Sequence, residues 1–317
     1  MKRHQTMSGK VDEYVAYRRS MGYALSVTAR ELQRFAQHAD STGHHGPLTT
    51  ELALSWARLA ANRTPLYQAR RVEMVRSFAR YLAAFEPGTQ IPPRGLLGPA
   101  HRRIQPYLYS EEEIAQLMDA AQSLPPNNGL RPKTYRTLLG LLASTGLRVC
   151  EALKLQRDDV DTTRDLLTVR QTKFHKSRIV PLHESVTAAL DAYGEARDTY
   201  HPRAASTQFL LSERGTALLP SVVHYTFQKL RGNLNWGDHN GRPPRLYDLR
   251  HTFACRRLLE WYRQGIDVNH AIVYLSAYLG HVKPSDTYWY LSGTPDLLAI
   301  AAERFERFSG NPSGGSS

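Results

Sequence analysis

Residues 145–155 read TGLRVCEALKL, and this stretch decides how the second half of the chain is interpreted. The apolar residues 134–144 before it are typical of a helix, which Thr145-Gly146 is expected to end. A new helix is predicted to begin near Arg148, and Glu151 lies one turn later, where it can pair with the guanidinium. An arginine at a helix start is more often a cap or a surface residue, so Arg148 alone does not identify a site.

Three further stretches place basic and aromatic side chains at expected turns and within a helix. They are TKFHKSRIVPL (172–182), YDLRHTFA (247–254) and LGHVKPSDTYWY (279–290). The first is predicted to form a hairpin whose turn carries Lys173 and Lys176, although such a tip is normally only solvated. Arg250 and His251 interrupt an otherwise apolar helical stripe. A cation in such a stripe needs a partner, which favours a specific role for Arg250.

The last stretch combines a histidine with an aromatic cluster. His281 follows Leu279-Gly280, a pattern typical of a helix end or a tight turn, where a histidine is often only structural. Tyr288 and Tyr290 flank Trp289, and aromatic clusters usually belong to a core. Each feature taken singly therefore has a structural explanation.

The charge of the chain favours a polyanionic partner. Among 317 residues there are 41 Lys and Arg against 29 Asp and Glu, so the formal net charge is +12. Nucleic acid is the first expectation and an acidic membrane surface the second. Residues 1–105 hold 16 basic and 7 acidic residues, a net charge of +9, which leaves only +3 for the rest. The N-terminal third is therefore expected to grip the polyanion.

The first hundred residues have the apolar periodicity of successive helices. Thr28 and Glu31 have the spacing of a capping box and predict a helix start, and Met21 and Leu59 extend the apolar stripes of the neighbouring helices. A later helix displays four arginines that could form a solvated face. The uneven charge instead favours phosphate contacts for Arg70, Arg71, Arg76 and Arg80.

Composition changes after residue 86. Residues 87–106 are rich in Pro and Gly, include Arg102 and Arg103, and are predicted to be a basic interdomain linker that also contacts DNA. Ser110 and Glu113 then form a second capping-box pattern. Residues 166–169 and 179–182 are predicted strands.

The end of the chain is predicted to form one more helix. Thr294 caps it, Pro295 opens it, and Leu298, Ala301, Phe305 and Phe308 form a one-sided apolar stripe. This stripe either packs on its own domain or is exchanged into a neighbouring protomer, and both alternatives stay open. The tail 309–317 is expected to be disordered.

Several function classes lack their sequence signatures. There is no phosphate-binding GxxxxGK[ST] loop, no GxGxxG, no HExxH and no GxSxG, so kinase, dehydrogenase and common hydrolase functions have little support. Cys150 and Cys255 are the only cysteines, which excludes a Cys-rich zinc site and favours a reducing cytoplasm. The first ten residues have no apolar segment of a signal peptide, and no apolar run is long enough to span a membrane. No metal and no cofactor are expected.

Taken in their order along the chain, the four stretches resemble the tyrosine recombinase (phage integrase) family. The resemblance covers residues 107–308 and extends more loosely to the N-terminal helices. It implies a mainly α fold, with a helical core-binding domain at 1–86, the linker at 87–106, and a mostly helical catalytic domain at 107–308. That catalytic domain would carry a small antiparallel β-sheet.

The resemblance also implies roles for individual residues. Tyr290 would be the nucleophile, because it follows His281 by nine residues as in the family, whereas Tyr288 follows it by seven. Glu151 would support the first catalytic arginine. Lys173 matches the family's hairpin lysine better than Lys176. Arg148 and Arg250 match the family's first and second catalytic arginines, and His281 matches the His/Trp position of the Leu-Gly-His motif.

One position departs from the family pattern. The family usually has histidine three residues before the second arginine, where this chain has Tyr247. A phenol with a pKa near 10 is a poor proton acceptor at neutral pH, although it can donate a hydrogen bond. The departure puts a proton-accepting role at this position in doubt.

The implied function is site-specific recombination of double-stranded DNA at inverted-repeat core sites by a homotetramer, through a 3′-phosphotyrosyl intermediate. Two guanidiniums could stabilise the charge that develops on the phosphate without a metal ion. Three alternatives remain: a type IB-like DNA relaxase, a non-catalytic architectural protein on the same fold, and a basic RNA-binding protein. The last lacks any recognisable RNA-binding module.

Overall fold

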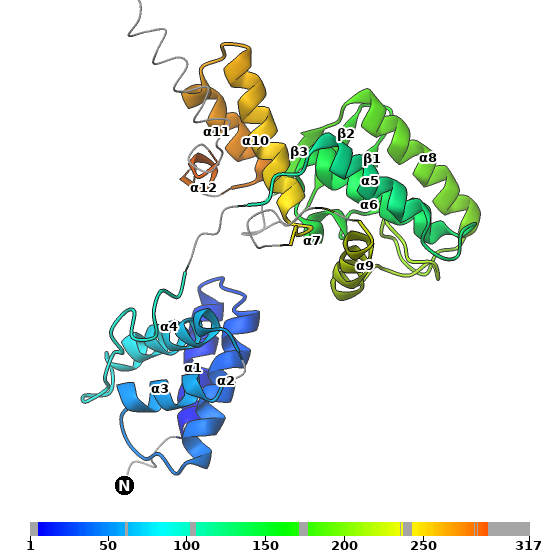
Figure 1. The fold of residues 1–317 in the computed structure, drawn as a ribbon. Helices are drawn as coiled ribbons and strands as arrows, with labels where there is room; N and C mark the ends of the chain where they lie inside the picture. Colours follow the sequence, from blue (N-terminus) through cyan, green and yellow to red (C-terminus); the bar gives the residue numbers. More distant parts are fainter. Residues whose placement is uncertain are drawn as a thin grey trace, which may run out of the picture. The chain divides into compact units, whose positions relative to one another are not determined.

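A computed structural model describes residues 6–60, 63–101, 106–170, 177–234, 236, 243–281, 283 and 285–290. The chain forms two compact units, Met1–Ile104 and Gln105–Ser317 (Figure 1). Helices dominate the described residues of both units and the second unit carries a small antiparallel sheet, which confirms the expected fold class. The functional division into a core-binding domain, a linker and a catalytic domain stays a prediction.

The first unit is a group of helices around one apolar core. Its helices are α1 (Met7–Ser20), α2 (Ser26–Ser41), α3 (Thr50–Arg58) and α4 (Pro65–Leu82). Thr64 caps α4 and Pro65 occupies its first turn, where a missing backbone N–H costs nothing. Phe35, Trp56 and Phe78 are fully buried among residues of all four helices. The helix periodicity read from the sequence therefore identifies the faces that form this core.

Three details of the first unit differ from the predictions. Helix α2 begins at Ser26 without a side-chain cap, so the capping box of Thr28 and Glu31 is wrong. Glu31 is buried instead, and its carboxylate accepts hydrogen bonds from Arg34 and Tyr67. Met21 and Leu59 are exposed, since each lies just beyond the end of its helix.

Hydrogen bonds hold the first part of the predicted linker against the helices of the N-terminal unit. Gln90 donates from its backbone to Leu48 O at 2.8 Å, Arg76 Nε donates to Pro92 O at 2.8 Å, and Arg70 Nε donates to Ala100 O at 3.1 Å. Arg102 and Arg103 lie outside the described residues.

The second unit contains more helices and the sheet. The helices are α5 (Glu111–Gln122), α6 (Leu130–Thr145), α7 (Val149–Ala152), α8 (Glu184–Tyr200), α9 (Pro220–Gly232), α10 (Asp248–Arg263), α11 (Val268–Leu279) and α12 (Ser285–Tyr288), with a short 3-10 helix at Arg157–Asp159. The predicted capping box of α5 is confirmed, because Glu113 N donates to Ser110 Oγ and Ser110 N donates to the Glu113 carboxylate. Helix α6 packs against α5 and α8 (Figure 1).

The sheet has the order β1-β2-β3 and is antiparallel throughout. The two predicted strands correspond to β2 (Leu166–Val169) and β3 (Arg178–Pro181). Strand β1 (Val160–Asp161) was not predicted, because two residues are too few to show an alternating pattern. The predicted hairpin turn, with Lys173 and Lys176, lies outside the described residues, as does the predicted C-terminal helix.

Helices α10, α11 and α12 bring the end of the described chain onto the rest of the second unit. A separate apolar cluster includes Cys255 and Leu258 of α10, Ile272 and Leu275 of α11, and Tyr290. Helix α10 also packs on α6, and α11 on β3. The C-terminal ends of α6 and α11, the start of β3 and the first turn of α10 thereby meet. None of the described helices is long and apolar enough to cross a membrane.

Candidate active site

Two helix C-termini form the framework of the site. Helix α6 ends at Gly146 and α11 ends at Gly280, and both glycines have left-handed backbones with φ of 62° and 68°. The last carbonyl groups of a helix have no partner within it and carry partial negative charge. Arg250 Nη1 donates to Gly146 O at 2.7 Å and its Nη2 donates to Leu279 O at 2.6 Å. Arg250, which matches the family's second catalytic arginine, is thus hydrogen-bonded to the C-terminal ends of both helices.

Arg148 reaches the same place from the start of α7. Its Nη2 donates to Gly280 O at 3.2 Å, next to the Leu279 carbonyl that Arg250 binds. The two guanidiniums are therefore neighbours, although they are 102 positions apart in the sequence. Burial, and then the charge of Arg148, lower the pKa of Arg250, whose side chain is 1 % exposed. Two adjacent guanidiniums are a pair of cations of the kind that can bind an anion with paired donors.

Glu151 balances part of this charge. Its carboxylate accepts hydrogen bonds from Arg148 Nη1 at 2.7 Å and from Arg178 Nη2 at 2.8 Å. Burial by itself would raise its pKa, but the hydrogen bond and charge of Arg178, together with the Arg148 backbone N–H and charge, lower it to about 2. Glu151 is therefore ionised at neutral pH and orients Arg148, as its one-turn spacing predicted.

Arg178 is a member of the cluster that the sequence analysis missed. It opens β3, binds Glu151, and donates from Nε to Tyr278 O at 2.7 Å at the end of α11. The available signal was a charged residue at the start of the apolar strand Arg178–Pro181. That signal does not reveal a partner 27 or 100 residues away.

His281 contacts the buried arginine directly. Its Nε2 lies 2.9 Å from Arg250 Nη2, and its Nδ1 lies 2.7 Å from Thr287 Oγ1. Because arginine can only donate, Nε2 is the acceptor and Nδ1 carries the hydrogen that is donated to Thr287. Burial, and then the charges of Arg250 and Arg148, lower the pKa of His281 to about 4. The imidazole is consequently neutral at physiological pH.

Tyr290 lies in an aromatic group beside these polar residues. Its ring centroid is 6.2 Å from that of His281 in a stacked arrangement, and 5.4 Å from that of His251. The side chain is 2 % exposed. Burial raises the pKa of Tyr290 to about 12, while the charge of Arg250 opposes the rise. The structure therefore brings Arg148, Arg250, Glu151, His281 and Tyr290 together.

Tyr247 and His251 extend the aromatic group by one turn of α10. Tyr247 precedes the helix, is 42 % exposed, and its ring centroid lies 4.8 Å from that of His251. His251 is 8 % exposed, and its Nδ1 is buried with no hydrogen-bond partner among the described residues. In the sequence, His251 interrupts an apolar stripe, a feature that does not by itself predict a role.

The arginines of α4 divide between surface and core. Arg70 and Arg80 are exposed and Arg76 is half-buried. Arg71 is 8 % exposed, stacks on the Trp56 ring at 3.6 Å and lies 3.8 Å from the Glu31 carboxylate. Because Arg71 shares the buried face of α4, its contacts are within the first unit.

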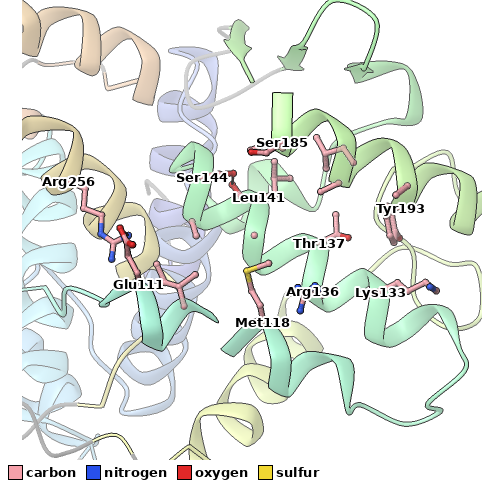
Figure 2. A pocket seen from close by; sticks show the side chains of 17 residues that line it. Glu111, Met118, Lys133, Arg136, Thr137, Leu141, Ser144, Ser185, Tyr193 and Arg256 are labelled. Carbon is pink, nitrogen blue, oxygen red and sulfur yellow. Dashed lines mark hydrogen bonds and ion pairs between the residues drawn. The ribbon is translucent and has the colours of Figure 1, made fainter. Parts of the chain in front are cut away.

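The second unit also contains a cavity away from these residues. A cavity of about 590 Å³ lies between α5, α6 and α8, with Met118 and Leu141 on its wall and Arg136 and Arg256 beside it (Figure 2). It contains none of the predicted site residues. In the described part of the chain, no group of three His, Cys, Asp or Glu side chains is arranged to hold a metal ion.

Comparison with known proteins identifies the family. The model of the phage integrase family matches residues 108–295. "Putative integrase/recombinase y4rB" of Sinorhizobium fredii (strain NBRC 101917 / NGR234) is 43 % identical over 309 residues, covering 95 % of this chain and 98 % of that protein. "Tyrosine recombinase XerA" of Thermococcus onnurineus (strain NA1) is 30 % identical over 243 residues, covering 75 % of each chain.

Solved structures share the fold at lower identity. The Tn1549 transposon integrase in complex with transposon right-end DNA has a TM-score of 0.68 at 15 % identity, covering 96 % of this chain and 100 % of that one. A lambda integrase dimer bound to a COC′ core site has a TM-score of 0.57 at 18 % identity, covering 90 % and 77 %. The chain belongs to the phage integrase family and is a tyrosine-type site-specific recombinase.

Proposed function

We propose that this recombinase cuts and rejoins double-stranded DNA at inverted-repeat core sites through a 3′-phosphotyrosyl intermediate on Tyr290. The biological setting would be integration, excision or resolution of a mobile element. Two protomers would bind one core site, and a homotetramer would act on two paired duplexes.

The pair Arg148 and Arg250 is the observation that carries the proposal. Both guanidiniums are anchored on the adjoining carbonyls of Leu279 and Gly280, and His281 and Tyr290 lie beside them. Cations fixed in advance at the place where charge develops stabilise a transition state without reorganising during the reaction. A phosphodiester under attack develops that charge on its nonbridging oxygens, which two guanidiniums can bind.

With Tyr290 as the nucleophile, the reaction would proceed through a covalent protein–DNA intermediate. Attack by the Tyr290 oxygen splits strand exchange into two phosphoryl transfers, and the phosphotyrosine keeps the energy needed for rejoining. Lys173 would protonate the departing 5′ oxygen as a general acid. Because Tyr290 is 2 % exposed, the side chains that cover it must open before its hydroxyl can reach a phosphate.

Other residues would bind and assemble the complex. Arg70, Arg76 and Arg80 would contact phosphates, as would Arg102 and Arg103, and the excess positive charge of residues 1–105 supports this assignment. Arg71 is the weakest member of that group, because it is committed to Trp56 and Glu31. We favour exchange of the helix predicted at 294–308 between protomers as the link between assembly and delivery of Tyr290.

Covalent trapping tests the proposal. Wild-type protein and Tyr290→Phe are incubated with DNA from the gene's flanking region, nicked near candidate inverted repeats, and the products are separated on denaturing gels. We expect a protein–DNA adduct with wild type only, since Phe keeps the ring but has no oxygen to attack phosphorus.

Binding of the same DNA by both proteins is the control. Tyr290→Phe should bind with nearly wild-type affinity. An adduct that persists in Tyr290→Phe would move the nucleophile to another residue. Tight, salt-sensitive binding without any wild-type adduct would favour an architectural function.

A further inference from the structure

The entry segment, residues 107–109, follows the predicted linker directly and is hydrogen-bonded to α10. Tyr109 is 2 % exposed and uses all three of its polar groups in these contacts. Its backbone N–H donates to Thr252 Oγ1 at 3.0 Å, its carbonyl accepts from Arg256 Nη2 at 2.8 Å, and its hydroxyl donates to Arg245 O at 3.0 Å. A single residue of the entry segment therefore holds the chain from position 245 to position 256.

The entry segment is itself fixed to the rest of the second unit. The Tyr107 hydroxyl donates to the Glu113 carboxylate, which also takes part in the capping box at the start of α5. The Tyr109 ring meets those of Tyr107 and Trp236 edge-to-face, at centroid distances of 5.0 Å and 5.7 Å. Leu108 packs against the apolar cluster formed by α10 and α11. The segment therefore gives α10 a fixed support.

Helix α10 presents opposite sides to the entry segment and to the candidate site. An α-helix turns by about 100° per residue, so Arg250 and Thr252 point to nearly opposite sides of it. Arg250 faces the end of α6, where its guanidinium donates to Gly146 O. Thr252 and Arg256, one turn apart, share the other side and bind Tyr109. The entry segment therefore supports α10 from behind Arg250.

Thr252 makes two hydrogen bonds in this buried contact. Its Oγ1 accepts from Tyr109 N and donates to Asp248 O, four residues earlier in α10, at 3.0 Å. A threonine hydroxyl can donate and accept at the same time, and Thr252 is 2 % exposed. Without that hydroxyl the Tyr109 N–H would be buried with no acceptor, which is costly. The entry segment and α10 would then have to shift apart to let water reach it.

We propose that Thr252 and Tyr109 are positioning residues that keep α10, and with it the Arg250 guanidinium, where it can bind the phosphate under attack. This inference rests on the proposed function. Neither residue touches the reacting atoms, so each acts only through the position of Arg250. A displacement of about 1 Å can lower a rate by about 100-fold, because paired donors no longer meet their acceptors. Since the entry segment follows the linker, the same contact connects the end of the linker to Arg250.

The first experiment measures the single-turnover rate of adduct formation on the nicked DNA and, separately, the affinity for that DNA. Thr252→Val keeps the branched shape and removes the hydroxyl. We expect its rate to fall by about 10–100-fold. Its affinity should stay nearly that of wild type, because the basic residues of the first unit are unchanged. Thr252→Ser returns the hydroxyl and should recover most of the lost rate.

Thr187→Val is the matched control for the loss of a buried threonine hydroxyl. Thr187 is 7 % exposed, and its hydroxyl also donates to the carbonyl four residues earlier, that of His183 at 3.5 Å. It lies in α8, which carries none of the site residues. The rate of Thr187→Val should therefore stay within about twofold of wild type.

A double-mutant cycle separates action through Arg250 from a general loss of structure. Arg250→Lys keeps the charge but cannot present paired donors, so it already lacks what correct positioning supplies. Thr252→Val should therefore lower the rate of Arg250→Lys much less than it lowers the rate of wild type. Tyr109→Phe removes only the hydrogen bond to Arg245 O and should also slow adduct formation. It replaces Thr252→Val if melting temperature shows that the latter is unfolded.

Each outcome bears on one claim. A folded Thr252→Val that forms adduct at the wild-type rate would overturn the proposal, as would failure of Thr252→Ser to recover any rate. Equal losses in the wild-type and Arg250→Lys backgrounds would also overturn it, since the effect would then not pass through the guanidinium. An equal fall in Thr187→Val would assign the loss to general destabilisation. Absence of any adduct with wild type would instead overturn the proposed function.

Discussion

At the level of single residues, Glu151 links three parts of the site. It binds Arg148 at the start of α7 and Arg178 at the start of β3, and both arginines also bind backbone carbonyls at the end of α11. A buried carboxylate between two cations is held by charge-assisted hydrogen bonds. If one charged member of such a group is removed, the other charges stay buried without a partner. These unpaired buried charges destabilise the folded state.

Glu151→Gln should therefore destabilise the second unit by about 3–5 kcal/mol at pH 7. The folded-state pKa of Glu151 is lowered to about 2, so its stabilisation is present above the ordinary carboxyl range and is lost as pH falls from about 4.5 to about 2. Urea unfolding of wild type and variant at pH 7 and pH 3 checks this. The difference in unfolding free energy should shrink at pH 3; a constant difference would contradict the assigned ionisation.

At the level of elements, the ends of α6 and α11 decide where the arginines lie. Gly146 has a φ of 62°, and a Cβ there would stand 2.5 Å from Phe253 Cδ1 and 3.2 Å from Leu279 Cδ2. Helix α10 can therefore approach α6 closely only because this position lacks a side chain. The same close approach lets Arg250 reach the Gly146 carbonyl.

Gly146→Ala should cost about 2–5 kcal/mol, combining about 1–2 for a left-handed alanine with about 1–3 for overpacking. Gly265→Ala is the matched control, because Gly265 has a φ of 76° but nothing within 4 Å of the added methyl group. It should show only the backbone strain. Denaturant titrations of both variants measure the difference, and equal costs would exclude the steric contact with Phe253.

At the level of the whole molecule, the two compact units have separate apolar cores. The buried cluster around Phe35, Trp56 and Phe78 belongs to the first unit, whereas the clusters that contain Leu138 and Leu258 belong to the second. Units with their own cores can unfold independently, so one unfolding free energy need not describe the chain.

Calorimetry of the full chain should accordingly show two heat-absorption peaks. Gly146→Ala should lower the transition of the second unit by roughly 2–4 °C for each kcal/mol lost, and Trp56→Ala should lower only the other. A single peak displaced by both substitutions would show that the units unfold together.

The helices and the order of the motifs could be predicted from the sequence because they depend on local spacing. The 3.6-residue stripes gave the cores of α2 and α4, the Ser110–Glu113 spacing gave the start of α5, and Thr145-Gly146 gave the end of α6. The spacing from His281 favours Tyr290 over Tyr288 as the nucleophile, and that assignment stays a prediction. The four motifs sufficed to predict the family.

Pairings between distant residues were decided only by the tertiary structure. The partners of Arg178, the burial of Arg71 against Trp56, and the place of His251 beside Tyr290 join residues that no local pattern relates. Sequence periodicity states which face of an element is apolar, but not which charged side chain a neighbouring element will meet. That choice follows from how α10, α11 and β3 pack around the end of α6, because buried charges must find their partners across those contacts.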